Sequence, residues 1–99
     1  MSKFESIDIK EFKAKASSGD YVVLDVRTPG ETAQGKLFED ALELDVYSPD
    51  FMSKLNKLDK GAKYLIYCRS GSRTKFVLDL MEKLDFIEAH DLRGGILSS

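Results

Sequence analysis

Apolar runs alternate with amphipathic stretches along the chain, which predicts strands separated by helices. The two clearest strands are residues 21–26 (YVVLDV) and Lys63–Tyr67 (KYLIY), where β-branched and aromatic residues are concentrated. A weaker edge strand is expected to begin at residues 6–7, and further strands are expected at residues 41–46 and 86–90. Strands that alternate with helices in this order favour an α/β fold with a parallel sheet covered by helices on both faces.

Helical signals occupy the segments between these strands. Asp8 is a typical N-cap for a helix whose apolar face includes Ile9 and Phe12, and Ser17-Ser18-Gly19 ends this helix. The break at Thr28-Pro29-Gly30 is followed by one or two expected helical turns. The first half of the chain therefore predicts one regular helix and one short helical segment.

Two further helices are expected in the second half of the chain. Ser48-Pro49 is a good helix start, because a capping residue precedes proline, and this helix is expected to run to about residue 60. The last helix is expected over residues 72–84. Its predicted core-facing side consists of Phe76, Val77, Leu80, Met81 and Leu84.

Length and charge narrow the classes of function. The 99 residues suffice for one domain, residues 1–99. A net charge of −2 with scattered Lys and Arg gives no support for a nucleic-acid partner. No apolar run approaches the roughly 18–20 residues of a membrane span, and the N-terminus lacks the apolar stretch of a signal peptide. We therefore expect no membrane partner and a cytoplasmic location.

The supply of metal-binding side chains is small, because the chain has one cysteine, Cys68, and one histidine, His90. A single cysteine excludes an intramolecular disulfide, and these two residues cannot form a typical structural zinc site. No metal and no cofactor are expected. Any chemistry has to come from one thiol, arginines, carboxylates and backbone amides.

The most informative segment is CRSGSRT, residues 68–74, which we call the Cys68 loop. Cys68 directly follows the strand Lys63–Tyr67, at the sheet edge where parallel α/β folds bind ligands. The bend at Gly71 and the following helix N-terminus direct backbone N–H groups toward the thiol. Further polar groups in the loop are Arg69, Ser70, Ser72, Arg73 and Thr74. This setting favours the thiolate, which is the nucleophilic form of cysteine.

A plainer interpretation of Cys68 is a small apolar residue that ends a strand, which is the common role of buried cysteines. The composition of the Cys68 loop argues against it, because the neighbours are charged, polar or glycine. We therefore favour a nucleophile.

Three segments together resemble the successive signatures of rhodanese-like domains. They are Asp25-Val26-Arg27 at a strand end, the Cys68 loop with the pattern C-x-x-G-x-R-[ST], and the turn Leu92-Arg93-Gly94-Gly95. Their order and spacing match over nearly the whole chain. The resemblance implies a parallel sheet of about five strands and a cysteine that carries a sulfane sulfur as a persulfide.

The resemblance also implies a sulfurtransferase activity of the thiosulfate type. Cys68 would take sulfur from a small anionic donor such as thiosulfate and pass it to cyanide or a thiol. Asp25 and Arg27 would support the Cys68 loop, or equally they form a charged pair that caps a strand end. The residues expected to bind the donor and the transferred sulfur are Arg69, Ser70, Gly71, Ser72, Arg73 and Thr74.

Two alternatives remain open. One is a sulfur-relay or protein-binding module that serves a sulfur-accepting protein without turnover of small molecules. The other is a cysteine-dependent phosphatase or arsenate reductase, whose loops hold one residue more between cysteine and arginine than the four found here.

The segment Gly35–Ala41 (GKLFEDA) departs from the G-H-I-P-G-A of rhodanese-like relatives, with Lys36 in place of histidine. The resemblance therefore does not predict how a substrate enters the site on this side.

Overall fold

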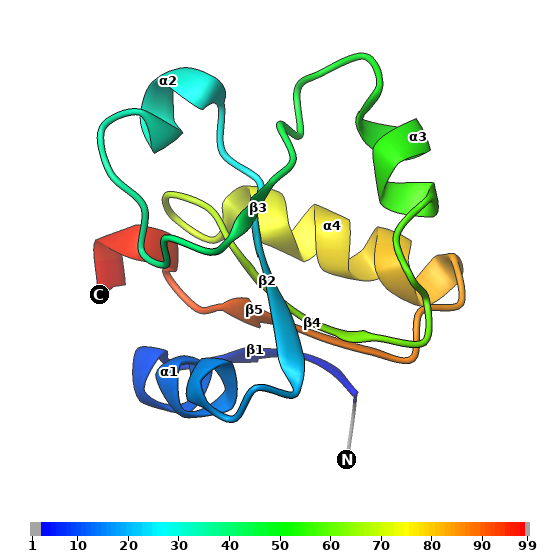
Figure 1. Ribbon diagram of the computed structural model, residues 1–99, viewed down its shortest axis with the longest axis horizontal. Helices are drawn as coiled ribbons and strands as arrows, with labels where there is room; N and C mark the ends of the chain where they lie inside the picture. Colours follow the sequence, from blue (N-terminus) through cyan, green and yellow to red (C-terminus); the bar gives the residue numbers. More distant parts are fainter. Residues whose placement is uncertain (1–2, 99) are drawn as a thin grey trace.

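Five parallel strands form the centre of the computed structural model, which describes residues 3–98 (Figure 1). The strand order is β1-β5-β4-β2-β3, and every neighbouring pair is parallel. The strands are β1 (Phe4–Ile7), β2 (Tyr21–Asp25), β3 (Leu42–Glu43), β4 (Lys63–Tyr67) and β5 (Glu88–Leu92). The predicted α/β class and the parallel five-stranded sheet are confirmed.

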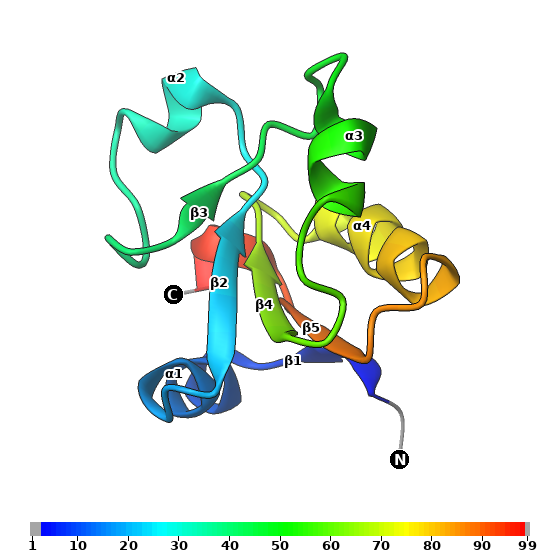
Figure 2. The ribbon, with the colours of Figure 1, turned by 45° about the vertical axis from the view of Figure 1, so that its right-hand side comes forward.

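Helices cover both faces of this sheet. Figure 2 shows α3 and α4 on one side and α1 on the other. The helices are α1 (Ile9–Ser17), α2 (Pro29–Thr32), α3 (Phe51–Asn56) and α4 (Ser72–Lys83), with a 3-10 helix, η1 (Gly95–Ser98), near the C-terminus. Within residues 3–98, none of these helices has the length and apolar character required to cross a membrane.

The core is divided in two by β4, whose side chains alternate between the faces of the sheet. Tyr64 and Ile66 point toward α3 and α4, where Leu55 and Met81 complete a larger cluster. On the α1 side, a smaller cluster gathers Ile7, Phe12, Ala41, Leu65, Tyr67 and Leu92. Because β4 lies between β5 and β2, the residue that follows it is held from several directions.

Several predicted boundaries of the strands are wrong. The last strand is Glu88–Leu92 and not 86–90, because the N–H of Phe86 donates to the Met81 carbonyl and still belongs to the end of α4. The strand expected over 41–46 is reduced to Leu42–Glu43 at the sheet edge, because a turn precedes it; the N–H groups of Leu44 and Val46 still donate to the carbonyls of Asp25 and Val26 without forming a regular strand. The strand expected over 21–26 ends one residue earlier, at Asp25.

The helix predictions fare unevenly. Asp8 caps α1 as expected, accepting a hydrogen bond from the N–H of Glu11 at 2.8 Å. The helix expected from Ser48-Pro49 begins only at Phe51, because residues 45–48 form a turn closed by a backbone bond. Phe76 was expected in the core but is 58% exposed, since the buried side of α4 is rotated toward Thr74, Val77, Leu78 and Met81.

Candidate active site

The Cys68 loop lies where the sequence predicts, between the end of β4 and the start of α4. Gly71 is the N-cap of α4 and has a φ of 94°, a left-handed conformation that glycine adopts without strain. This bend brings the first amides of the helix back toward the sheet edge. The strand end, the bend and the 12-residue helix therefore meet at Cys68.

The thiol of Cys68 is fully buried and yet lies among polar groups. Its Sγ accepts a hydrogen bond from the N–H of Gly71 at 3.0 Å. On another side, the thiol donates to the hydroxyl of Thr74, with 3.9 Å between Sγ and Oγ1. The side chain also packs at the edge of the larger apolar cluster. Burial alone fits the plain apolar interpretation, but an amide pointed at sulfur is the arrangement that stabilises an anionic sulfur.

The backbone of the Cys68 loop is held from behind by η1. The N–H of Ile96 donates to the Cys68 carbonyl at 2.8 Å, and the N–H of Leu97 donates to the Arg69 carbonyl at 3.1 Å. Gly95 makes this close approach possible. A Cβ at position 95 would lie 2.4 Å from the Arg69 oxygen and 2.6 Å from the Cys68 oxygen.

Gly95 supports the Cys68 loop, a role that the sequence does not predict. The double glycine was interpreted as a turn, and its packing against the Cys68 loop is visible only in three dimensions. Both glycines have a positive φ, 78° at Gly94 and 64° at Gly95, so the turn alone accounts for the pair and the sequence carries no signal of the packing. The two glycine-containing turns also touch each other, since a Cβ on Gly71 would lie 3.1 Å from the nitrogen of Gly94.

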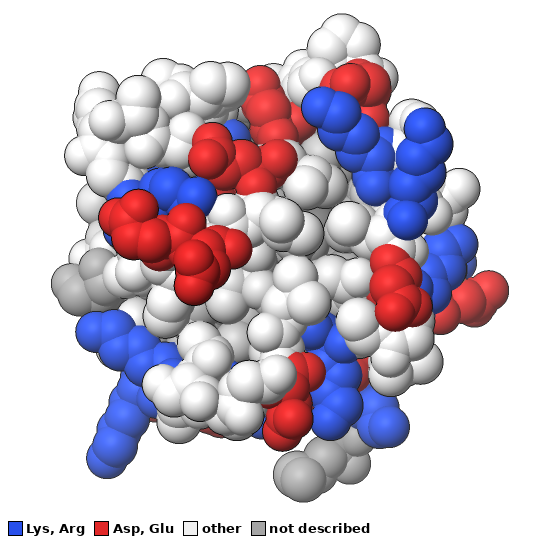
Figure 3. Space-filling model, in the orientation of Figure 1, with Lys and Arg blue, Asp and Glu red and all other residues white. Residues whose placement is uncertain are grey.

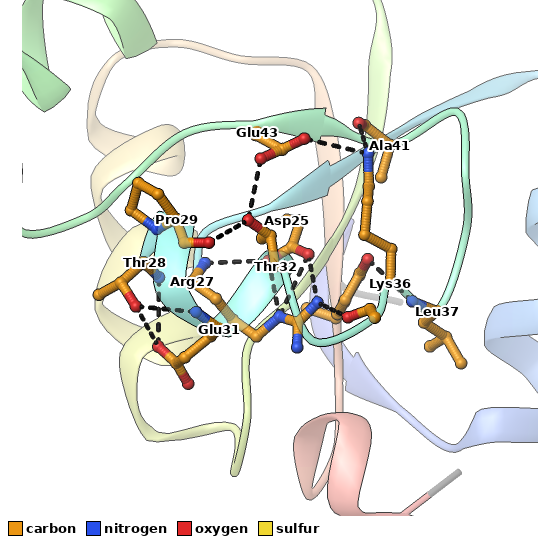
Figure 4. A network of polar contacts seen from close by, with 12 residues as sticks. Asp25, Arg27, Thr28, Pro29, Glu31, Thr32, Lys36, Leu37, Ala41 and Glu43 are labelled. Atoms are coloured by element: carbon orange, nitrogen blue, oxygen red, sulfur yellow. Dashed lines mark hydrogen bonds and ion pairs between the residues drawn. The ribbon is translucent and has the colours of Figure 1, made fainter.

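Arg73 fixes the beginning of α4 to α2. Its guanidinium makes two hydrogen bonds with Glu31, at 2.8 and 3.0 Å. Glu31 also closes a capping box with Thr28 at the start of α2, which Figure 4 shows. The hydrogen bonds from Arg73 lower the pKa of Glu31 to about 2. The same ion pair raises the pKa of Arg73, to which the nearby Cys68 also contributes.

Asp25 and Arg27 form a buried ion pair at the end of β2 (Figure 4). The Arg27 guanidinium contacts both carboxylate oxygens of Asp25, with the shortest distance 2.7 Å, and reaches the Gly35 carbonyl at 2.8 Å. Hydrogen bonds to Asp25 raise the pKa of Arg27. The pair therefore caps β2 and fixes the segment around Gly35, which faces the Cys68 loop across a pocket.

This pocket, of about 750 Å³, is the open space next to the loop. Arg69 lines one wall, and the segment from Gln34 to Leu37 lines another. The remaining lining residues are Arg27, Glu31, Ile96 and Leu97. Arg69, Ser70 and Ser72 are exposed, so the charged and hydroxyl groups expected to meet an anionic donor face solvent.

Lys36, which lines the pocket, ties together the segment that follows it (Figure 4). Its ammonium group donates to the carbonyls of Glu39 and Ala41, at 3.1 and 2.9 Å, and pairs with Glu43 at 3.3 Å. These contacts hold the segment from Lys36 to Glu43 as a closed loop.

Charges and potential metal ligands are spread out over the described part of the chain. Acidic and basic side chains lie interspersed on the face shown in Figure 3. Among residues 3–98, no three His, Cys, Asp or Glu side chains gather in a group that could hold a metal ion. The Cys68 loop remains the candidate active site.

Comparison with known proteins agrees with this geometry. The sequence matches the rhodanese-like domain family over residues 8–98. A rhodanese-related protein from Thermoplasma volcanium superposes with a TM-score of 0.82 at 25% identity, covering 96% of this chain and 89% of that one. A rhodanese-like domain protein from Staphylococcus aureus superposes with a TM-score of 0.76 at 30% identity, covering 95% of this chain and 89% of that one.

Two curated relatives differ in length. A sulfurtransferase from Allochromatium vinosum is 32% identical over 83 residues, which are 84% of this chain and 75% of that protein. A tRNA uridine(34) hydroxylase from Cytophaga hutchinsonii is 37% identical over 90 residues, 88% of this chain, but the chain spans only 28% of the hydroxylase. The family match and the structural likeness lead to one conclusion: the chain belongs to the rhodanese-like domain family.

Proposed function

We propose that this domain is a sulfurtransferase that carries a sulfane sulfur on Cys68 as a persulfide. In the first step, the Cys68 thiolate attacks the outer sulfur of thiosulfate, a sulfur–sulfur bond forms at Sγ, and sulfite leaves with the electrons of the broken bond. In the second step, cyanide attacks the terminal sulfur, thiocyanate leaves, and the thiolate returns. A thiol acceptor reacts in the same way and becomes a persulfide itself.

The hydrogen bond from the Gly71 N–H to Cys68 Sγ is the observation that carries this proposal. A hydrogen bond to a charged group is worth about 1.5–3 kcal/mol, and a helix N-terminus adds about 0.3–1 kcal/mol. An anionic sulfur at this position thus gains about 2–4 kcal/mol from the loop and helix together. The same donors serve the thiolate before transfer and the persulfide anion after it.

Burial of the thiol sets a requirement for this reaction. Because Cys68 has no exposed surface, a donor reaches Sγ only when the loop opens at its exposed residues, Arg69, Ser70 and Ser72. Arg69 lines the pocket beside the loop, where it attracts an anionic donor. We propose that the donor enters from this pocket and that Arg73, tied to Glu31, keeps the helix end of the loop fixed.

A second candidate is a sulfur relay to a protein partner. The observation in its favour is the alignment with larger enzymes: the chain matches 28% of the Cytophaga hutchinsonii hydroxylase and 30% of a tRNA uridine(34) hydroxylase from Agrobacterium fabrum. The matched region is less than a third of each hydroxylase, so a domain of this kind occurs within larger chains. In this role Cys68 would form the persulfide, but small acceptors would remove the sulfur slowly.

Steady-state turnover distinguishes the candidates. Purified protein is incubated with thiosulfate and cyanide, and thiocyanate is measured; the sulfurtransferase proposal predicts sustained production that is lost in Cys68→Ser. Formation of the persulfide without thiocyanate production favours the relay. Hydrolysis of a phosphate ester without any sulfur loading would contradict both and support the phosphatase alternative.

A further inference from the structure

A buried carboxylate, Asp91, lies behind the Cys68 loop at the C-terminal end of β5 and has no exposed surface. Its two oxygens are each approached by a hydroxyl: Ser6 donates to Oδ1 at 2.5 Å and Thr74 donates to Oδ2 at 2.7 Å. Among residues 3–98, no Lys, Arg or His lies within ion-pair distance of this carboxylate. Buried carboxylates are normally paired with a cation, so this one calls for an explanation.

Thr74 connects Asp91 to the thiol. Its Oγ1 lies 2.7 Å from Asp91 Oδ2 and 3.9 Å from Cys68 Sγ, and all three side chains are fully buried. A hydroxyl has one proton to donate. The Gly71 carbonyl oxygen also lies 3.0 Å from Thr74 Oγ1. The Asp91 carboxylate is nearer and charged, so it is the stronger hydrogen-bond acceptor. The hydroxyl proton therefore faces Asp91, and a lone pair faces the thiol.

We propose that Asp91 accepts the proton of Cys68 through Thr74. The S–H proton moves to Thr74 Oγ1 while the Thr74 hydroxyl proton moves to Asp91 Oδ2, which leaves a thiolate and a carboxylic acid with no change in total charge. Thr74 then donates its new O–H to the thiolate, and the protonated Asp91 donates to Thr74. Asp91 is a positioning residue in this scheme, because it acts on the reacting sulfur through Thr74.

The relay answers a problem that the buried thiol creates. While the Cys68 loop is closed, the buried thiol cannot pass its proton directly to water, and a net negative charge added to a buried site is costly. Exchange of one proton between two buried groups moves the charge from carboxylate to sulfur without adding any. This inference deepens the proposed function and rests on it for its biological role, although the proton transfer itself needs no sulfur donor.

Charged groups on the neighbouring elements surround the relay. Arg73 lies near the thiol, and its ion pair with Glu31 raises the arginine pKa and lowers the Glu31 pKa to about 2. On β2, the ion pair of Asp25 and Arg27 is buried. Two further groups flank β5: the exposed Arg93, which donates to the Ser6 carbonyl, and His90, which points to the opposite face of the sheet from its neighbour Asp91.

The test is the pH profile of Cys68 alkylation by iodoacetamide, a small neutral reagent. The chain has one cysteine, so the rate reports on this thiol alone. Two coupled buried groups release their protons in two steps, so the wild type should show a plateau of reactivity between two rises. Asp91→Asn should show one rise at higher pH, and its rate at neutral pH should fall by about tenfold or more.

Matched variants separate a relay from a structural role. Thr74→Ser keeps the hydroxyl and should keep the two-step profile, whereas Thr74→Val, of similar shape, should lose it. Ser6→Ala removes the other hydroxyl on Asp91 and should keep both steps. Should Asp91→Asn fail to fold, the comparison of Thr74→Ser with Thr74→Val decides the question.

Two results would overturn the relay. One is a single-step profile in the wild type. The other is a rate at neutral pH that rises in Asp91→Asn, which would mean that the carboxylate only opposes negative charge on sulfur. Neither result bears on whether thiosulfate loads Cys68, which is measured separately. Conversely, a two-step profile with no sulfur loading would support the relay and contradict the proposed function.

Discussion

Replacement of Gly95 by alanine tests how the Cys68 loop is held. The methyl group would lie 2.4 Å from the Arg69 oxygen, whereas an ordinary carbon contact begins near 3.4 Å, so the two segments would have to separate by about 1 Å. That movement breaks the hydrogen bonds from Ile96 and Leu97 to the loop carbonyls. In addition, Gly95 has a φ of 64°, which an alanine adopts only with strain.

The cost of this substitution can be worked out from these two effects. A left-handed conformation costs a non-glycine residue about 1–2 kcal/mol, and forcing extra atoms into a packed site costs about 1–3 kcal/mol. Gly95→Ala should therefore lower the free energy of unfolding by about 2–5 kcal/mol, a large share of the roughly 5–15 kcal/mol available to a domain of this size. The melting temperature should fall by about 10 °C or more.

Gly19→Ala is the matched control. Gly19 also has a positive φ, 82°, but a Cβ there would meet no atom within 4 Å. Its substitution should cost only the backbone strain, about 1–2 kcal/mol. Urea unfolding followed by circular dichroism measures both variants. Equal losses of stability in the two would show that Gly95 does not pack against the loop as described, and the reasoning would fail.

Three further predictions concern charge and packing. Arg69→Ala should slow sulfur loading at limiting thiosulfate by about tenfold, because a charge-assisted contact is worth about 1.5 kcal/mol or more. Ser70→Ala should change the loading rate little. Equal loading rates in the two variants would contradict this prediction. The Glu31–Arg73 ion pair stabilises the fold fully above pH 4.5, the pKa of Glu31 in the unfolded chain, and this stabilisation is lost as the pH falls toward about 2. The free energy of unfolding, measured as a function of pH, should therefore fall by about 1 kcal/mol over this range. The same loss should be missing in Glu31→Gln. Phe76→Ser should change the free energy of unfolding by less than about 0.5 kcal/mol, whereas Met81→Ala should lower it by about 2–5 kcal/mol. Similar losses for both variants in thermal unfolding would refute the placement of Phe76 at the surface.

The elements that the sequence predicted well are those with local causes. β4 is recognisable because its residues are β-formers buried on both faces, and α1 because Asp8 caps it. The errors come from tertiary context. β3 is short because it lies at the sheet edge, and α3 starts late because a turn precedes it, which no local propensity reveals.

The candidate site was predictable in its identity but not in its supports. The position of Cys68 and the bend at Gly71 follow from their place between a strand and a helix. The packing of Gly95 and the contact of Thr74 with Asp91 join segments far apart in the chain, and one sequence contains no signal for either distance. The pairing of Arg73 with Glu31, 42 positions away, is of the same kind.

The central claim is that Cys68 carries sulfur, and the mass of the intact protein tests it most directly. After incubation with thiosulfate and removal of excess reagent, the wild type should gain the mass of one sulfur atom, and cyanide should remove it. Cys68→Ser, checked for native folding by circular dichroism, should gain nothing. An unchanged mass in the wild type, or the same gain in Cys68→Ser, would contradict the account.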